Sequence, residues 1–118
     1  MEVKAKYVYA IRHNKTGRMY VGCSQHIQGR FRNHMNQLKN RKHKSAEMQK
    51  DFDEYGADFS VIELEKTVDC RVHLGNRYFP LYMLEELKWM RRLGTVENGY
   101  NKQDRMARKQ LEMGIDRL

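Results

Sequence analysis

The chain is poor in cysteine and has no long apolar run. Cys23 and Cys70 are its only cysteines, and neither belongs to a CxxC pair or to a Cys/His cluster with zinc-finger spacing. This usage is typical of a reduced, cytosolic protein. No apolar stretch approaches the roughly 20 residues that span a bilayer, and the first residues, MEVKAKYVYAIRHN, lack the apolar core of a signal peptide. We therefore expect a soluble, cytoplasmic protein with no membrane partner.

Internal repeats, low-complexity tracts and long linkers are also missing from the sequence. Its 118 residues suit one domain with one core. Acidic residues are in the minority, since 15 Asp and Glu stand against 23 Lys and Arg, which gives a formal net charge of +8. This excess of positive charge favours a polyanion as the partner, and nucleic acid before an acidic membrane surface.

The positive charge is concentrated between residues 30 and 50. This segment contains seven Lys or Arg residues and one acidic residue, Glu47. Two interpretations are open: a surface that contacts the DNA backbone, or the solvated face of a helix in a generally basic protein. The first interpretation predicts DNA contacts from Arg32, Lys39, Arg41, Lys42, His43 and Lys44.

The pattern of strand-forming residues predicts a small sheet. Residues 7–11 and 18–21 have extended character, and the HNKTG segment between them predicts a hairpin turn with Gly17 at a positive φ. A third strand is expected over residues 58–65, where apolar and polar residues alternate. Residues 67–77 have no clear period and contain a Gly-Asn pair, so they predict a loop.

Three helices are expected around this sheet. Apolar residues recur at helical spacing over residues 27–40, which places Arg30 and His34 on one face. Residues 45–56 begin with a serine suited to an N-cap and end with a glycine. Residues 80–93 have proline in the predicted first turn and glycine directly after the last residue.

Glu86 is the residue whose setting most demands a partner. Its neighbours three and four positions away on the predicted helix are Tyr82, Met83, Trp89 and Met90, all apolar or aromatic. An ionised carboxylate on such a face loses hydration unless a cation or hydrogen-bond donors replace the water. Magnesium, which prefers hard oxygen ligands and keeps several waters, would do so. Alternatively, Glu86 pairs with a Lys or Arg, or reaches solvent at the domain edge.

Four further residues suit the cleavage of a phosphodiester, which needs an activated water, positive charge at the phosphate oxygens and a stabilised leaving oxygen. Arg30 can form a forked contact with phosphate, and His34 lies one turn after it. Tyr9 or Tyr20 could take a proton from water if positive charge lowers the phenol pKa from about 10. Ordinary packing of aromatic residues on strands is the alternative explanation for the two tyrosines, and a surface position is the alternative for His34.

The order of these residues resembles that of the GIY-YIG endonuclease family. Tyr7-Val8-Tyr9 corresponds to the first half of the name-giving motif and Tyr20-Val21-Gly22 to the second, with ten residues between Tyr9 and Tyr20. Arg30, Glu86 and Asn101 follow in the order that the family shows. Either half of the motif is weak by itself, but five elements in this order are specific. The likeness extends from about Tyr7 to Asn101 and is greatest to the catalytic domains of phage homing endonucleases.

The resemblance implies a fold, an activity and a role for each site residue. The fold is a small α/β (α+β) domain with a three-stranded antiparallel sheet flanked by helices. The activity is hydrolysis of DNA with one divalent ion, Mg²⁺ or Mn²⁺, by a homing-type or phage-encoded enzyme in the cytoplasm of a bacterial or phage-infected cell. The implied roles are general base for Tyr9, orientation of water or phosphate for Tyr20, phosphate clamp for Arg30, assistance to the base for His34, metal ligand for Glu86, hydrogen bonding that holds the site together for Asn101, and close backbone approach at Gly22.

The sequence departs from the family pattern in two ways. Tyr7 stands where glycine is usual, and Val8 and Val21 stand where the family name has isoleucine. We expect residues 1–103 to form the catalytic domain and residues 104–118 a helical tail, which is too short to be a separate DNA-binding domain. The tail could pack on its own domain, on DNA or on a second copy, so we expect a monomer or a homodimer formed through it. A second hypothesis is a module of the same fold that binds nucleic acid and has lost catalysis.

Overall fold

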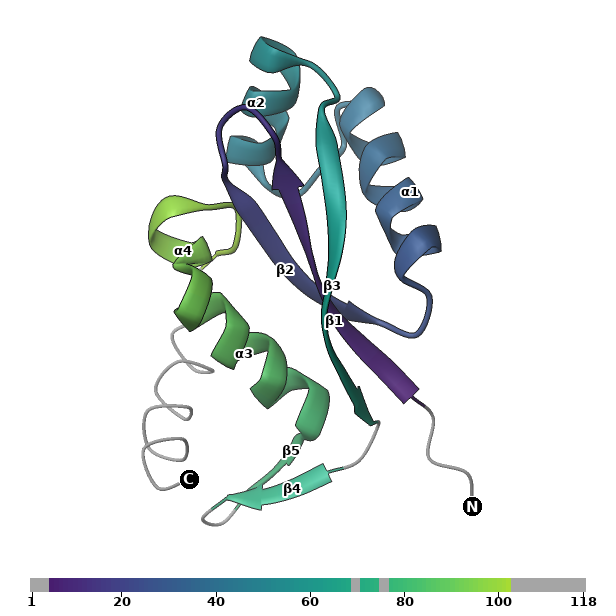
Figure 1. The fold of residues 1–118 in the computed structure, drawn as a ribbon, viewed down its shortest axis with the longest axis vertical. Coiled ribbons are helices and arrows are strands. Elements are labelled where there is room, and N and C mark those ends of the chain that lie inside the picture. Colours follow the sequence, from purple (N-terminus) through teal and green to yellow (C-terminus); the bar gives the residue numbers. More distant parts are fainter. Residues whose placement is uncertain (1–4, 69–70, 75–76, 103–118) are drawn as a thin grey trace.

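A three-stranded antiparallel sheet forms the centre of the molecule (Figure 1). In the computed structural model, which describes residues 5–68, 71–74 and 77–102, the strand order is β2-β1-β3. The strands are β1 (Ala5–His13), β2 (Met19–Ser24) and β3 (Phe59–Val68), so that β2 is an edge strand. Two four-residue strands, β4 (Arg71–Leu74) and β5 (Arg77–Pro80), pair with each other in a separate antiparallel sheet.

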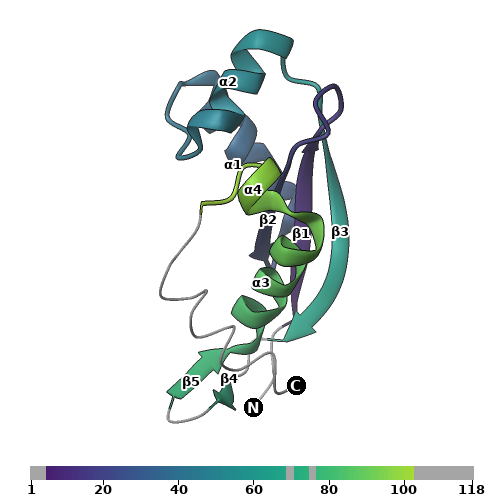
Figure 2. The same cartoon turned by 90° about the vertical axis from the view of Figure 1, so that its left-hand side faces the viewer.

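Four helices complete the described part of the chain. They are α1 (Ile27–Lys39), α2 (Ala46–Tyr55), α3 (Leu81–Leu93) and the short α4 (Thr95–Asn98). Helices α1 and α2 lie beside the upper part of the sheet, and α3 runs along its lower part toward the β4–β5 hairpin (Figures 1 and 2). This arrangement confirms the predicted fold of a three-stranded antiparallel sheet flanked by helices.

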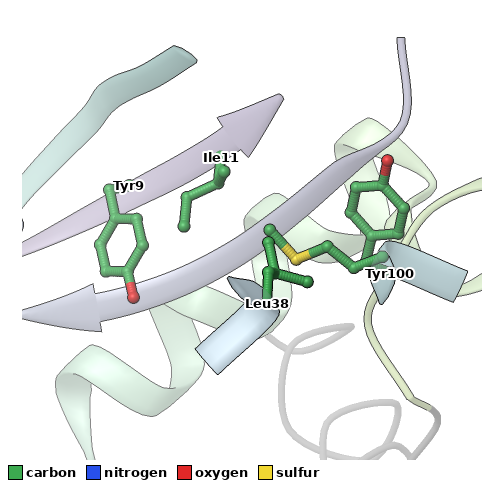
Figure 3. Close-up of a cluster of buried hydrophobic side chains, with 5 residues drawn as sticks. Tyr9, Ile11, Leu38 and Tyr100 are labelled. Atoms are coloured by element: carbon green, nitrogen blue, oxygen red, sulfur yellow. The ribbon is translucent and has the colours of Figure 1, made fainter. Parts of the chain in front are cut away.

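The central strand is covered on both faces. Tyr9 and Ile11 pack with Leu38 of α1, Met48 of α2 and Tyr100 on one side of the sheet (Figure 3). The alternate residues Val8 and Ala10 pack on the other side with Val21 of β2 and Met90 of α3. Because successive side chains of a strand point to opposite faces, β1 separates an α1–α2 layer from an α3 layer.

A β-bulge lies in β3 opposite Val8 and Tyr9. Val8 pairs with Glu65 and Tyr9 pairs with Glu63, so Leu64 is an extra residue in β3. Val61 packs in the α1–α2 layer and Leu64 in the α3 layer, as alternation predicts. The bulge then places Glu65 on the α3 side as well, where it accepts hydrogen bonds from Lys88 and Trp89. The alternation expected for this strand is therefore interrupted between Leu64 and Glu65.

The predicted turn and helix-end residues are confirmed in detail. Gly17, Gly56 and Gly94 have φ values of 76°, 88° and 61°, a region that glycine enters at little cost. The Ser45 hydroxyl accepts a hydrogen bond from the Met48 backbone N–H at 3.2 Å, as an N-cap residue does. Pro80, by contrast, is the N-cap residue of α3 and lies directly before the first turn, in which it was expected.

The loop predicted over residues 67–77 is wrong for the described part of that segment. Strand β3 continues to Val68, and β4 and β5 follow it. Strands of four residues are too short to show a clear period, and these two pair with each other instead of with the main sheet.

The tail predicted for residues 104–118 lies outside the described residues. Within the ranges that the structure describes, no helix has the length and apolar character needed to cross a membrane.

Candidate active site

A cleft of about 370 Å³ opens at the edge strand β2, between α1 and α3. Six of the residues predicted for catalysis or close approach at the site line it: Tyr9, Tyr20, Gly22, Arg30, His34 and Glu86. The other lining residues are Lys6, Cys23, Asn33, Gln37, Lys44 and Tyr82. Side chains more than 70 positions apart in the sequence therefore meet in one place, as the motif order predicted.

The two layers of the fold each supply part of this cleft. Tyr9 lies opposite Gly22 across the β1–β2 pair, and Tyr20 lies opposite Ile11, which puts both tyrosines on the α1 side of the sheet. Arg30 and His34 face them from successive turns of α1. Glu86 belongs to α3, in the other layer, and meets them at the edge where Gly22 has no side chain.

Tyr9 is both a core residue and a site residue. Its ring is 1% exposed and packs in the α1–α2 core, while its hydroxyl lies 3.3 Å from Nε2 of His34. Burial raises the pKa of Tyr9 well above its ordinary value, the neighbouring Tyr20 raises it further, and the positive charge of Arg30 opposes both. Tyr9 is therefore a neutral phenol near pH 7 in the protein alone. The packing explanation for this tyrosine is confirmed, and because Tyr9 also lines the cleft, a chemical role stays a prediction.

Tyr20 and His34 adjoin each other in the cleft, with ring centroids 4.8 Å apart. Burial raises the pKa of Tyr20, and the charge of Glu86 adds to this effect. Burial lowers the pKa of His34 to about 4, with further contributions from His43 and from Arg30. His34 is consequently neutral near pH 7 and can act there only as a neutral donor or acceptor.

Glu86 is the carboxyl group of the cleft, and its pKa is shifted from the ordinary value. Burial raises its pKa to about 7, although the positive charges of Arg30 and Lys6 act in the opposite direction. Among the ion pairs of the described residues none involves Glu86, so the alternative of a Lys or Arg partner in direct contact is not what the structure has. The described residues also contain no group of three His, Cys, Asp or Glu side chains that could hold a metal. Among the described residues that line the cleft, Glu86 is the one carboxylate.

Asn101 completes the edge strand. Its side-chain Oδ1 accepts from the backbone N–H of Val21 at 2.8 Å, and its Nδ2 donates to the Val21 carbonyl at 3.0 Å. The neighbouring Tyr100 N–H donates to the Met19 carbonyl at 3.0 Å. Because no other strand of the described residues lies on this side of β2, these bonds satisfy backbone groups that an edge strand leaves open. Asn101 therefore holds the strand that carries Tyr20 and Gly22, and it lines an adjacent cavity of about 230 Å³.

The residues predicted to contact DNA lie in different settings. Lys44 is exposed and lines the cleft. Arg41 has a positive φ of 57° and forms an exposed ion pair with Asp53 at 3.2 Å. His43 is half-buried and hydrogen-bonded to His34. Arg32, Lys39 and Lys42 are exposed outside the cleft. DNA contact by these residues stays a prediction.

Sequence reasoning missed several residues of the cleft. Asn33 follows Arg30 by one helical turn, so helical periodicity could have identified it. Lys6 shares a strand face with Val8 and Ala10, and its Nζ lies 3.8 Å from the ring centroid of Tyr82 on α3. Two-residue alternation could have placed Lys6 on this face, but only the packing of α3 shows that it approaches Glu86.

The comparison with protein families agrees with this geometry. The family model described as "GIY-YIG catalytic domain" matches residues 5–110. The chain belongs to the GIY-YIG family. No curated protein matches the chain. As a GIY-YIG catalytic domain, the chain is a DNA endonuclease.

Two solved structures have a similar fold. The catalytic domain of homing endonuclease I-TevI matches with a TM-score of 0.69 and 24% sequence identity, covering 84% of this chain and 99% of that one. A mutant of the catalytic domain of intron endonuclease I-TevI matches with the same TM-score and identity, covering 85% of this chain and 95% of that one. At this identity the likeness concerns the fold.

Proposed function

We propose that this chain is a divalent-metal-dependent DNA endonuclease of the homing type, borne by a phage or a mobile intron. The observation that carries the proposal is the meeting of Glu86 with Tyr9, Tyr20, Arg30 and His34 in one cleft of a basic protein. A module that binds nucleic acid without cleaving it would need the basic surface but not a half-buried carboxylate that shares a cleft with two tyrosines. The similar structures belong to an intron endonuclease and a homing endonuclease, which supports the proposed biological role.

Glu86 fits a magnesium ion better than a metal that needs a full protein cage. Magnesium is commonly held by one or two carboxylates, several waters and the substrate phosphates, and the cleft offers one carboxylate. Burial raises the Glu86 pKa to about 7, so the ionised form lacks stabilisation that a cation would provide. A bound Mg²⁺ or Mn²⁺ would supply positive charge for the leaving oxygen of the phosphodiester.

The other side chains of the cleft bind the phosphate, activate the water and orient the reacting groups. The Arg30 guanidinium, exposed at the mouth of the cleft, has the planar fork that binds two phosphate oxygens. Tyr9 can take a proton from the attacking water only as a phenolate. Among the described residues, Arg30 supplies the positive charge that favours the phenolate. Tyr20 lies beside His34 and orients the water or the phosphate. Lys44 and Lys6 add positive charge along the cleft.

The test is cleavage of duplex DNA by the purified protein with magnesium, with manganese and with a chelator. Wild-type protein should cut only with a divalent ion. Glu86→Gln, which keeps the shape of the side chain and removes its charge, should lose cleavage while it still binds DNA. Cleavage in the chelator, or undiminished cutting by Glu86→Gln, would overturn the metal assignment. Mapping the cut positions on genomic DNA tests the homing role, because a homing enzyme cuts at few sites.

A further inference from the structure

Four groups form a continuous hydrogen-bonded line that leads from the cleft into the α1–α2 connection. The Tyr9 hydroxyl lies 3.3 Å from Nε2 of His34, and Nδ1 of His34 lies 2.8 Å from Nε2 of His43. The line ends at Ser45, whose backbone N–H donates to Nδ1 of His43 at 3.0 Å. Tyr9 and His34 belong to the site, but His43 has no role in the mechanism so far.

The end of this line fixes its direction. A backbone N–H can only donate, so Nδ1 of His43 must accept and a neutral His43 carries its proton on Nε2. This proton is donated to Nδ1 of His34, so a neutral His34 carries its own proton on Nε2. His34 then donates to the Tyr9 oxygen. Burial lowers the pKa values of both histidines, which keeps the two rings neutral near pH 7 as this argument requires.

The backbone N–H of Ser45 is held in place at the end of this hydrogen-bonded line. It is the N-cap residue of α2, and its hydroxyl accepts from the Met48 N–H, so its backbone position is held by the start of the helix. Ser45 is also buried, with 6% of its surface exposed. The start of helix α2 therefore determines, through His43, which ring nitrogen of His34 carries the proton.

We infer that His43 is a positioning residue, which holds His34 as a hydrogen-bond donor to the Tyr9 oxygen. This inference rests on the proposed function of Tyr9 as the base. A hydrogen bond donated to the oxygen stabilises the phenolate, and it opposes the effect of burial on Tyr9. The same bond turns the hydroxyl proton of the neutral phenol away from His34. His34 therefore does not take the Tyr9 proton while the line is intact.

The direct test is the protonation state of His34 in the wild-type protein. Long-range ¹H–¹⁵N spectra of the labelled protein identify the protonated nitrogen of each imidazole ring. We expect Nε2 to carry the proton in both His34 and His43 near pH 7. A proton on Nδ1 of His34 would overturn the inference. The measurement needs no cleavage, so it separates the hydrogen-bond direction from the proposed activity.

The functional test compares two substitutions of one residue. The amide of His43→Gln can accept from Ser45 and donate to His34, whereas His43→Leu can do neither. At saturating DNA and with magnesium, His43→Leu should lower the single-turnover rate by about tenfold or more, while His43→Gln should keep most of it. DNA affinity should change in neither. His26→Leu, an exposed histidine outside the cleft, is the matched control and should leave the rate unchanged.

The outcomes separate three explanations. Equal cutting by His43→Leu and wild type would overturn the inference and leave the proposed function intact. Weaker DNA binding by both His43 variants, with an unchanged rate for bound DNA, would overturn it in favour of a DNA contact. If His43→Leu does not fold, the protonation of His34 is measured in His43→Glu instead, because a carboxylate cannot donate a hydrogen bond. Loss of the Nε2 proton of His34 in this variant supports the inference, and retention of this proton contradicts it.

Discussion

The ring of Tyr9 lies against the backbone of Gly22 on the neighbouring strand, so closely that no side chain fits at position 22. A Cβ atom built on Gly22 would lie 2.6 Å from the Tyr9 hydroxyl oxygen and 2.7 Å from Cζ. Gly22 itself is an extended residue in β2 and has no positive φ. Its glycine is therefore required by the Tyr9 ring and not by the backbone conformation.

Gly22→Ala should displace Tyr9 and impair both stability and cleavage. Overpacking of this kind costs about 1–3 kcal/mol, which denaturant unfolding would measure. Cleavage should fall because the hydroxyl leaves its place beside His34. Gly29→Ala is the matched control, since its Cβ would meet only the His26 Cβ at 3.9 Å, and in a helix alanine is favoured over glycine by about 0.5–1 kcal/mol. Wild-type cutting by Gly22→Ala would show that the close packing is dispensable.

Arg30→Ala should slow the cleavage of bound DNA by about 100-fold or more, the usual cost of removing a donor aimed at a developing charge. Arg30→Lys should restore only part of the rate, because an ammonium lacks the planar fork. Arg32→Ala removes an exposed arginine on the same helix but outside the cleft. Arg32→Ala should weaken DNA binding and reduce the salt dependence of that binding, without changing the cleavage rate at saturating DNA. A merely twofold loss for Arg30→Ala would contradict the clamp role.

Glu86 should make the metal-free protein less stable as the pH rises. Its folded pKa of about 7 lies above the ordinary carboxyl value of 4.5, so the folded state holds the proton more tightly than the unfolded state. The stabilisation is complete below about pH 4.5 and is lost as the pH rises toward 7, by up to about 3 kcal/mol. Glu86→Gln should lack this loss in melting curves recorded with a chelator. Identical pH profiles for the two proteins would show that the carboxylate is not perturbed, and added magnesium should stabilise only the wild type.

Asn101→Asp should loosen the edge strand. The aspartate can still accept from the Val21 N–H, but it cannot donate to the Val21 carbonyl, and its charge repels that oxygen. A lost hydrogen bond of this type costs about 1–3 kcal/mol, and we expect faster hydrogen exchange at Val21 together with slower cleavage. Asn36→Ala, at an exposed position of α1, should change stability by about 0.5 kcal/mol or less. Unchanged exchange at Val21 would show that Asn101 does not hold this strand.

The sequence predicts well what depends on neighbouring residues. The apolar spacing of α1, the Ser45 cap and the three glycines at positive φ are local features, and the structure has each of them. The shared face of Arg30 and His34 follows from the same helical spacing, and both side chains line the cleft. The order of the motif residues was enough to name the family.

Features that depend on pairing between distant segments could not be predicted in this way. The bulge at Leu64 is visible only when β3 is aligned with β1. The bond between His34 and His43 depends on how the α1–α2 connection folds back, and the charged residues around His43 suggested a DNA contact instead. The bonds of Asn101 make sense only once β2 is known to be an edge strand.

The division of the cleft between two layers has a consequence for a newly made chain. Tyr9, Tyr20, Arg30 and His34 all precede β3, whereas Glu86 arrives with α3 and Asn101 follows it. Domains are made from the N-terminus onward, so a growing chain carries its basic helix and both tyrosines before it has its carboxylate. Such a chain still lacks Glu86, the proposed metal ligand. On the proposed mechanism, the nuclease therefore cannot cut until α3 has been made and has packed against the sheet.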